Sequence, residues 1–154
     1  MIAIKQAKLK DFANLMEIEV LPDQKEWHIP FETAYHDRSK LEVILTLFSG
    51  KQAIGYLVLD KAFAHYATFA ERHELGLKYF VIDKNHQRKG YGKQALQKLF
   101  VYAYAVSPDS NSICVTIPVK NKPAYDFFIS AGFVDSEKFY RGENGKEWIL
   151  HHKL

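Results

Sequence analysis

The spacing of apolar residues along the chain alternates between the period of strands and the period of helices. Runs rich in β-branched and aromatic residues predict strands, and the turns at Ser49-Gly50 and Asn144-Gly145 predict two hairpins. Apolar residues three and four apart predict helices. The strands are expected at residues 2–7, 42–48, 53–59, 75–83 and 112–117 and on both sides of Asn144-Gly145, and the helices at 9–20, 31–38, 91–105 and from Pro123 to Gly132.

Two of these helices have a clear apolar face. Pro22 is expected to end the first helix, whose face should hold Leu9, Phe12, Ala13, Met16 and Val20. In the longest helix, the face should hold Ala95, Leu96, Leu99, Phe100 and Ala103. Residues 61–74 mix both spacings and are expected to form a long loop with one or two helical turns. The order of elements is that of a single α+β domain over residues 1–154.

Length and composition fit one domain with its own core. Of the 154 residues, 47% are hydrophobic and 25% are charged, as in ordinary globular proteins. The net charge of +3 is dispersed, without a basic stripe, and argues against a nucleic-acid partner. No apolar run approaches the ~20 residues that span a bilayer, and the chain opens on a predicted strand rather than a signal peptide. We therefore expect a cytoplasmic protein with no membrane partner, whose one cysteine, Cys114, packs in the core.

The most informative segment is a glycine-containing turn between a predicted strand and the longest predicted helix. A helix N-terminus carries unpaired N–H groups and about half a positive charge, and glycines let the backbone approach a ligand. Together these features predict a site for a diphosphate. The turn consists of Gln87, Arg88, Lys89, Gly90, Tyr91 and Gly92, and Arg88, Lys89 and Lys93 add positive charge.

Two other phosphate-binding loops fit this turn poorly. The P-loop requires Gly-x4-Gly-Lys-Ser/Thr, which the sequence lacks. The dinucleotide fingerprint Gly-x-Gly-x-x-Gly has Ala95 at its last position here, and the repeated strand-helix-strand order of a doubly wound sheet is absent. The plain structural alternative is a tight turn that only opens a helix.

The turn and its surroundings resemble the GNAT acetyltransferases. Their loop has the pattern Gln/Arg-x-x-Gly-x-Gly/Ala, with an aliphatic residue shortly before it, here Ile82, and a later Asn-x-x-Ala helix followed by Gly-Phe. The resemblance implies an α+β fold with a mixed sheet of about six or seven strands, its fourth and fifth strands splayed apart, and about four flanking helices. The later motif appears here as Asn121-Lys122-Pro123-Ala124 and Gly132-Phe133.

The resemblance also implies which residues hold the co-substrate, acetyl-CoA. The N–H groups of residues 88–93 would bind the diphosphate, and the backbone of Ile82 would pair with the pantetheine arm. The Phe80 N–H would bind the acetyl carbonyl as the oxyanion donor. Asn121 would contact the cofactor, cap its own helix, or do both. The implied cofactor-binding set is Phe80, Ile82, Gln87, Arg88, Lys89, Gly90, Tyr91, Gly92, Lys93, Asn121 and Phe128.

The expected reaction is attack of an amine on the thioester, which requires a base and benefits from an acid. Many family members have a tyrosine acid four residues after the motif alanine, but this chain has Phe128 there. Tyr125 lies three residues earlier and is either an alternative acid or a packing residue. The seven histidines show no metal-ligand spacing, so no metal is expected. The candidates for the base are Glu74, His73, Asp83 and Lys78.

The region expected to border the acceptor site is acidic. Residues 17–38 hold six acidic and two basic side chains, in a chain whose net charge is positive. Such a rim would attract a cation, and the segment from Leu21 to Trp27 resembles bacterial spermidine/spermine-type acetyltransferases. The candidate acceptor-binding residues are Glu17, Glu26, Trp27 and Tyr35.

Three functional hypotheses follow. The first is an acetyl-CoA-dependent N-acetyltransferase for a small cationic primary amine such as a polyamine. The second is an acetyltransferase for a protein N-terminus, an amino acid or an aminoglycoside. The third, suggested by Phe128, is a non-catalytic acyl-CoA-binding module. Family members are often dimers, so the resemblance is also compatible with a homodimer.

Overall fold

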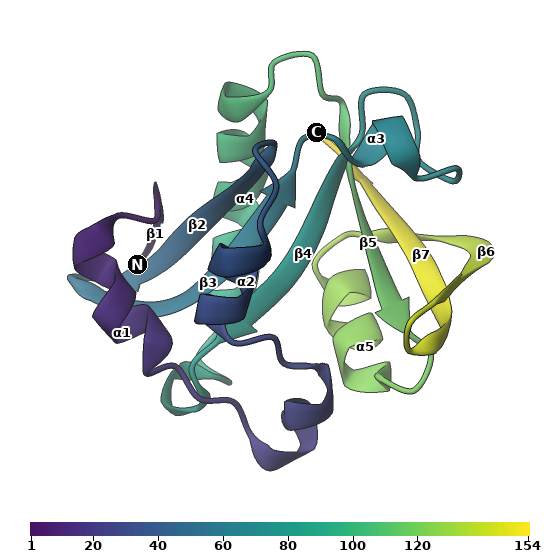
Figure 1. Cartoon of the computed structure of the whole chain (residues 1–154). Helices are drawn as coiled ribbons and strands as arrows, with labels where there is room; N and C mark the ends of the chain where they lie inside the picture. Colours follow the sequence, from purple (N-terminus) through teal and green to yellow (C-terminus); the bar gives the residue numbers. More distant parts are fainter.

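Seven strands form one mixed sheet in the order β1-β2-β3-β4-β5-β7-β6 (Figure 1). The computed structural model describes residues 1–154. Neighbouring strands are antiparallel except β4 and β5, which are parallel. The strands are β1 (Ile2–Gln6), β2 (Glu42–Ser49), β3 (Gln52–Asp60), β4 (Leu75–Ile82), β5 (Ser112–Pro118), β6 (Val134–Gly142) and β7 (Gly145–Lys153).

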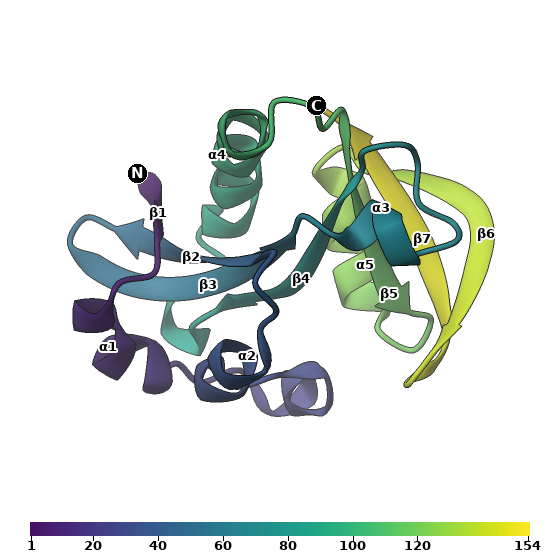
Figure 2. The ribbon, with the colours of Figure 1, turned by 45° about the horizontal axis from the view of Figure 1, so that its top comes forward.

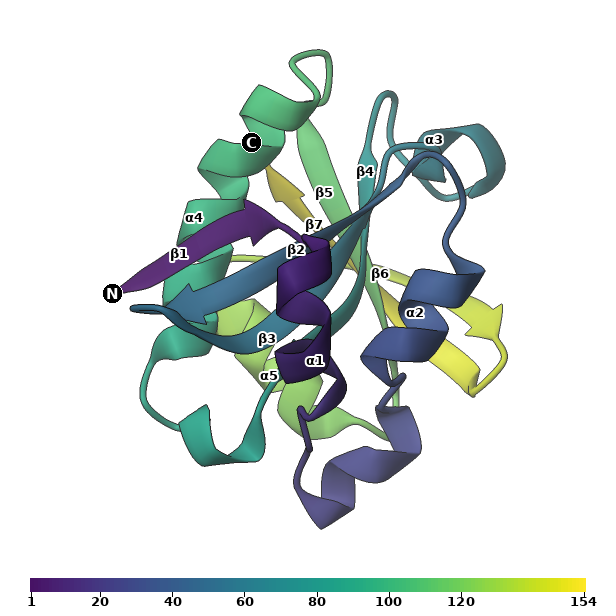
Figure 3. The same cartoon turned by 60° about the vertical axis from the view of Figure 1, so that its left-hand side comes forward.

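Helices cover both faces of the sheet. The α-helices are α1 (Phe12–Met16), α2 (Phe31–Asp37), α3 (Phe63–Tyr66), α4 (Tyr91–Val106) and α5 (Lys122–Ser130), and the 3₁₀ turns are η1 (Leu9–Asp11), η2 (Pro22–Trp27) and η3 (Lys84–His86). Figure 2 shows α4 on one face of the sheet and α1 and α2 on the other, and Figure 3 shows α1 and α2 together in front of the strands. As expected, the loop at 61–74 holds a single helical turn, α3. None of these helices has the length and apolar character that crossing a bilayer requires.

The sheet opens between β4 and β5. These strands pair only at Leu75 with Ile113 and at Gly76 with Cys114, although β4 has 8 residues and β5 has 7. Figure 1 shows the two strands close together near α3 and separating toward α5. The expected α+β fold with splayed fourth and fifth strands is therefore confirmed, and one edge of β4 has no strand partner over residues 77–82.

One row of directly opposed residues crosses β3, β4, β5 and β7, so its side chains share a face of the sheet. Val58, two residues away along β3, packs into the core under α1 and α2, and Phe63 of α3 packs against a member of the row. We call this side of the sheet the α1–α3 face. The row consists of Asp60, Gly76, Cys114 and His151.

Two main apolar cores lie on the two faces of the sheet. One joins the strands to α4 and α5, and the other joins them to α1 and α2. The apolar face of α4 packs as its spacing predicts, because every third or fourth residue reaches the sheet. Its buried residues are Ala95, Leu96, Leu99 and Ala103, with Phe100 partly buried.

The first helix differs from its expectation. Residues 9–11 form a 3₁₀ turn, so the α-helical phase starts one turn late, and α1 already ends at Met16. Leu9 is 81% exposed and Met16 54% exposed, whereas Leu15 is 1% exposed. Pro22 begins η2 instead of ending the helix, because a proline at the first position of a helical turn loses no hydrogen bond.

Candidate functional site

The turn before α4 forms a cradle of backbone N–H groups. Arg88 has a φ of 61° and Gly90 a φ of 80°, and these left-handed residues on either side of Lys89 curl the chain into a nest of the kind that binds anions. No hydrogen bond within the protein uses the N–H groups of residues 88–93. Lys89 and Lys93 are exposed, and the α4 dipole adds to their charge. The cradle is therefore suited to a diphosphate.

Gln87 braces this turn against two other segments. Its side-chain amide donates to the Ile82 carbonyl at 2.8 Å and exchanges two hydrogen bonds of 2.9 Å with Gln24 in η2. The Gln24 oxygen also accepts from the Leu21 N–H at 3.1 Å. The side chain of Gln87 therefore fixes the position of the turn, and the Ile82 carbonyl already accepts a hydrogen bond within the protein.

A β-bulge interrupts β4 in the stretch that has left β5. The register to β3 shifts between Lys78 and Val81, and the extra residue falls at Tyr79 and Phe80. Tyr79 has a φ of 53°, a left-handed conformation that is rare in strands. A bulge leaves its extra residue unpaired and bends the strand. The Phe80 N–H, expected to be the oxyanion donor, therefore lies at the irregular point of β4, next to the opening.

Aromatic rings of α5 pack beside the opening. Phe128 is buried, and its ring centre lies 6.0 Å from that of Phe80 and 5.1 Å from that of Phe127. The Phe127 ring also lies close to Gly92, where an added Cβ would come within 2.9 Å of it. The missing side chain at Gly92 thus lets the start of α4 approach α5 closely.

Two polar residues, the N-cap of α5 and a tyrosine within α5, are engaged within the protein. The side-chain oxygen of Asn121 accepts from the Ala124 N–H at 3.4 Å, which confirms its capping role, while its contact with the cofactor stays a prediction. The Tyr125 hydroxyl donates to Asp135 at 2.9 Å, and its ring lies 4.2 Å from that of Trp148. The hydrogen bond to Asp135 and burial raise the pKa of Tyr125. Both effects hold the proton on the phenol.

The cradle, the bulge and the opening all lie on a part of the chain that matches a known family. The model of the acetyltransferase (GNAT) family matches residues 12–133. This chain belongs to the GNAT acetyltransferases. The match includes β4, α4 and α5 and excludes only β1 and the final hairpin among the strands. The protein is accordingly an N-acetyltransferase.

Solved structures share this GNAT fold, whereas curated proteins give no match. Aminoglycoside acetyltransferase AAC(6')-Ib in complex with coenzyme A has a TM-score of 0.80 and 15% identity, over 99% of this chain and 95% of that one. A chimera of spermidine N-acetyltransferase SpeG from Vibrio cholerae and hSSAT has a TM-score of 0.68 and 15% identity, over 99% of this chain and 94% of that one. The ribosomal-protein-S18-alanine N-acetyltransferase from Escherichia coli has a TM-score of 0.69 and 16% identity, over 100% of this chain and 94% of that one. At these identities the likeness establishes the fold alone.

Three base candidates of this GNAT protein are exposed or already engaged. Lys78 is engaged by two carboxylates, with its Nζ 3.7 Å from an oxygen of Asp60 and 3.6 Å from one of Glu42. Asp83 caps η3, and His73 is exposed on the 61–74 loop. The fourth candidate, Glu74, is buried directly before β4. It belongs to a separate cluster of side chains at the end of the opening where β4 and β5 are paired.

Glu147 is a buried carboxylate on the α1–α3 face that no sequence pattern marked. It lies two residues before Ile149, which packs against α3 on that face. Its side chain fits against Gly142, where an added Cβ would come within 1.9 Å of its Oε2. Burial and the charge of Glu143 raise its pKa, while a hydrogen bond with Thr116 lowers it. Its only signal in the sequence is a charged residue within the alternation of β7.

The four acceptor candidates lie on three segments, and no hydrogen bond, ion pair or ring contact joins one candidate to another, although the Tyr35 ring of α2 packs 4.6 Å from that of Phe12 in α1. Glu17 is exposed at the end of α1, where it lines a cleft of about 240 Å³. Glu26 is exposed and Trp27 half-buried, both in η2. The ring of Tyr35 in α2 is covered by the guanidinium of Arg38 at 3.7 Å. The acidic segment thus covers part of the α1–α3 face, and no direct contact brings its four candidates together.

Proposed function

We propose that this acetyltransferase uses acetyl-CoA to acetylate the primary amine of a small cationic acceptor, such as a polyamine. The observation that carries the use of acetyl-CoA is the cradle of free N–H groups at residues 88–93, which lies at the open end of the sheet. A helix N-terminus with free donors and two exposed lysines stabilises a diphosphate.

Acetyl-CoA would supply an activated acetyl group as a thioester. In the proposal, the N–H groups of residues 88–93 hold its diphosphate, and Lys89 and Lys93 balance the charge. The free edge of β4 near Ile82 orients the pantetheine arm. The Phe80 N–H, at the bulge, donates to the acetyl oxygen as negative charge develops there. Loss of one such donor typically costs about 10²–10³ in rate.

We assign the deprotonation of the amine to Glu147. An alkylammonium has a pKa of about 10.4 and must lose a proton before it attacks. Glu147 lies on β7, on the α1–α3 face, and β7 pairs with β5 across the opening from β4. Burial raises its pKa, and a carboxylate whose pKa moves toward the working pH is a more effective base. Its negative charge would also pair with a cationic amine.

No side chain of α5 serves as the acid in this proposal. Phe128 has no proton to give, and Tyr125 is held by Asp135. The leaving thiolate has an ordinary pKa near 8.5, so it can leave unprotonated and take its proton from solvent. The reaction therefore needs a positioned donor and a base but no protein acid.

The cationic nature of the acceptor rests on charge. The segment at residues 17–38 carries six acidic and two basic side chains, and it wraps the face on which Glu147 lies. The test compares a diamine with the amino alcohol of the same chain length, which keeps the reacting amine but lacks the second charge. One additional ion pair contributes about 1 kcal/mol, so we expect about fivefold higher kcat/KM for the diamine. Equal values would reject the cationic acceptor.

A further inference from the structure

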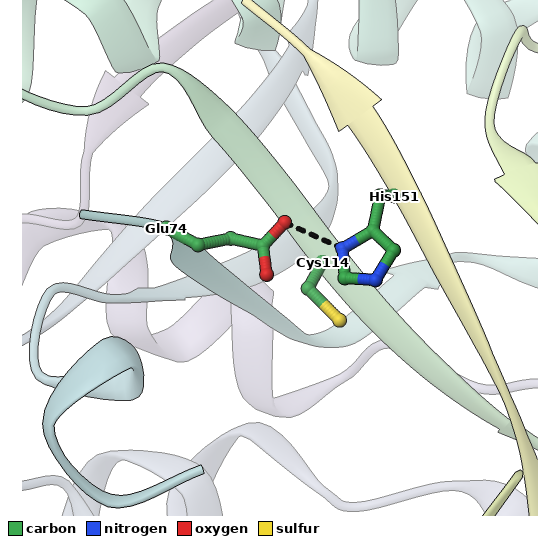
Figure 4. A group of neighbouring side chains, drawn as sticks. All are labelled: Glu74, Cys114 and His151. Carbon is green, nitrogen blue, oxygen red and sulfur yellow. Dashed lines mark hydrogen bonds and ion pairs between the residues drawn. The ribbon is translucent and has the colours of Figure 1, made fainter. Parts of the chain in front are cut away.

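Three side chains that are far apart in the sequence meet at the closed end of the opening (Figure 4). Glu74 directly precedes β4, Cys114 is on β5 and His151 on β7, and one ligand atom from each lies within 4.8 Å of the others. Strand register brings them together, because Cys114 is opposite Gly76 on one side and His151 on the other. The cluster lies at the paired start of β4, whereas the bulge and the N–H cradle lie toward and beyond its other end, so this cluster is separate from the proposed acetyl-transfer site.

Glu74 and Cys114 are buried and His151 is half-buried, and one member of the cluster has no hydrogen-bond partner. Glu74 is 1% exposed, and its Oε2 lies 2.6 Å from His151 Nδ1 and accepts from Ser112 Oγ at 2.8 Å. Its Oε1 accepts from the Glu71 N–H at 3.0 Å. Cys114 is also 1% exposed, and its thiol makes no hydrogen bond within the protein. An unpartnered thiol is therefore buried beside a carboxylate and an imidazole.

The electrostatics of this pocket oppose a bare thiolate. Burial and the negative charges of Glu74 and Glu71 raise the pKa of the Cys114 thiol. A divalent cation reverses this situation, because a coordinating thiol loses its proton to the metal's charge. The two carboxylates that disfavour a thiolate would then stabilise the ion.

We propose that Glu74, Cys114 and His151 bind a divalent cation of the zinc class. A thiolate, an imidazole and a carboxylate are the three ligand types that Zn²⁺ takes in proteins, and the sulfur ligand selects against Mg²⁺ and Ca²⁺. Ligand atoms about 2.0–2.1 Å from a tetrahedral ion lie more than 3 Å apart. The contact between Glu74 and His151 must therefore lengthen slightly when the ion enters.

A cleft next to the cluster provides the fourth ligand and a route for the ion. It has a volume of about 610 Å³, and Glu71 and His151 are among its lining residues. Glu71 Oε1 lies 3.9 Å from His151 Nδ1, so this exposed carboxylate is placed to complete the coordination. The hydrogen bond to Glu74 raises the pKa of His151, while burial and the charge of Lys138, which lines the same cleft, lower it. The negative charges of Glu74 and Glu71 together exceed the single positive charge of Lys138, so the pocket still favours a cation.

The ion would act on the architecture of the opening. β4 and β5 share only two residue pairs, and the cluster joins the start of β4 to β5 and β7 beside them. A bound ion would strengthen this closed end and raise stability by mass action. It would not touch the amine or the thioester, so acetyl transfer is expected without it.

The test uses the full chain, freed of metal with a chelator and titrated with Co²⁺ and then with Zn²⁺. Cys114 is the only cysteine, so a cobalt–thiolate charge-transfer band can arise from no other residue. We expect a band that saturates at one ion per chain, is removed by Zn²⁺ and is unaffected by Mg²⁺. Zn²⁺ should also raise the unfolding temperature.

Matched variants locate the site. His151→Gln and Glu74→Gln should weaken Co²⁺ binding by about 100-fold or more, since even loss of an outer-shell partner costs 10–100-fold. His73→Asn is the control, because His73 is an exposed neighbour with a φ of 60° and asparagine tolerates that conformation. Circular dichroism of the metal-free proteins verifies that each variant folds.

Two results would overturn the proposal. The first is the absence of a cobalt–thiolate band in the wild-type chain at stoichiometric Co²⁺, and this result needs no variant. The second is a band of equal affinity in His151→Gln, which would mean adventitious binding to the thiol only.

Discussion

Gln24 and Gln87 exchange two side-chain hydrogen bonds of 2.9 Å, which fasten η2 to the turn that opens α4. The amide of Gln87 also reaches the Ile82 carbonyl at the end of β4. Gln87 therefore sets the position of the N–H cradle relative to β4 through its neighbours. Because η2 belongs to the acidic segment at residues 17–38, the same contact links the segment proposed to face the acceptor to the cradle proposed to hold acetyl-CoA.

Breaking this link should weaken acetyl-CoA binding with little effect on kcat. Each hydrogen bond contributes about 1 kcal/mol, so we expect Gln24→Ala and Gln87→Ala each to raise the Kd for acetyl-CoA about fivefold. A double-mutant cycle measured by calorimetry should give a coupling of about 1 kcal/mol. Gln97→Ala, on the exposed face of α4, is the control. Additive effects of the two substitutions would show that the contact does not couple the segments.

The left-handed turn at Gly90 should be required for cofactor binding. Gly90 has a φ of 80° and open space where a Cβ would point, so backbone strain alone opposes a side chain. That strain is about 1–2 kcal/mol for most residues and smaller for asparagine. Gly90→Val should therefore lose more acetyl-CoA affinity than Gly90→Asn, as measured by calorimetry. Unchanged affinity in both variants would contradict the role of the cradle.

Glu147→Gln should make the protein more stable at neutral pH. The folded-state pKa of Glu147 is raised above its ordinary value, mainly by burial. The folded state then binds more protons than the unfolded state, so stability falls as pH rises from the ordinary pKa through the raised one. Glutamine removes this loss. We expect a higher unfolding temperature for Glu147→Gln at pH 7.5 and none of the gain at pH 4, with the exposed Glu32→Gln as control.

The same substitution should lower activity. Loss of a general base typically costs about 10²–10⁴ in rate, so kcat/KM of Glu147→Gln should fall at least about 100-fold while acetyl-CoA affinity is kept. Its pH–rate profile should also lose the limb that reports the carboxylate. A variant that is more stable and equally active would assign Glu147 a structural role and move the base elsewhere.

Tyr125→Phe should leave turnover close to the wild-type value. The Tyr125 hydroxyl donates to Asp135, and this bond and burial raise its pKa. Loss of a true general acid would lower kcat by about 10² or more. Steady-state kinetics at saturating acetyl-CoA distinguish the two cases. A large loss, recovered at low pH by solvent acid, would restore Tyr125 as the acid.

Local chemistry explains what the sequence could predict. The N–H cradle follows from Gly90 and the helix after it, and the face of α4 follows from a spacing that continues for four turns. The splayed strands came through the family resemblance, and β4 and β5 agree with it because they share only two residue pairs, Leu75 with Ile113 and Gly76 with Cys114. For the cradle and the α4 face, the determining residues lie within a short stretch of chain.

The remaining features depend on contacts between distant segments. Glu74 and His151 are 77 residues apart, and only the register of β4, β5 and β7 brings them together, so their spacing could not indicate a metal site. The face of Glu147 likewise depends on strand pairing. The prediction for the first helix was wrong because a 3₁₀ turn at residues 9–11 changes which residues face the sheet. The left-handed conformation of Tyr79 in β4 could not be predicted, because tyrosine has no preference for a positive φ.

The measurement that tests the central claim most directly is release of free CoA from acetyl-CoA, followed with a thiol reagent, across a panel of acceptors. The panel holds spermidine, spermine, putrescine, lysine, an aminoglycoside and short peptides, with the singly charged amino alcohol as control. We predict release that depends on the cationic amines and is strongest with polyamines. Acetyl-CoA binding without release from any amine would contradict the account and favour a non-catalytic acyl-CoA-binding module.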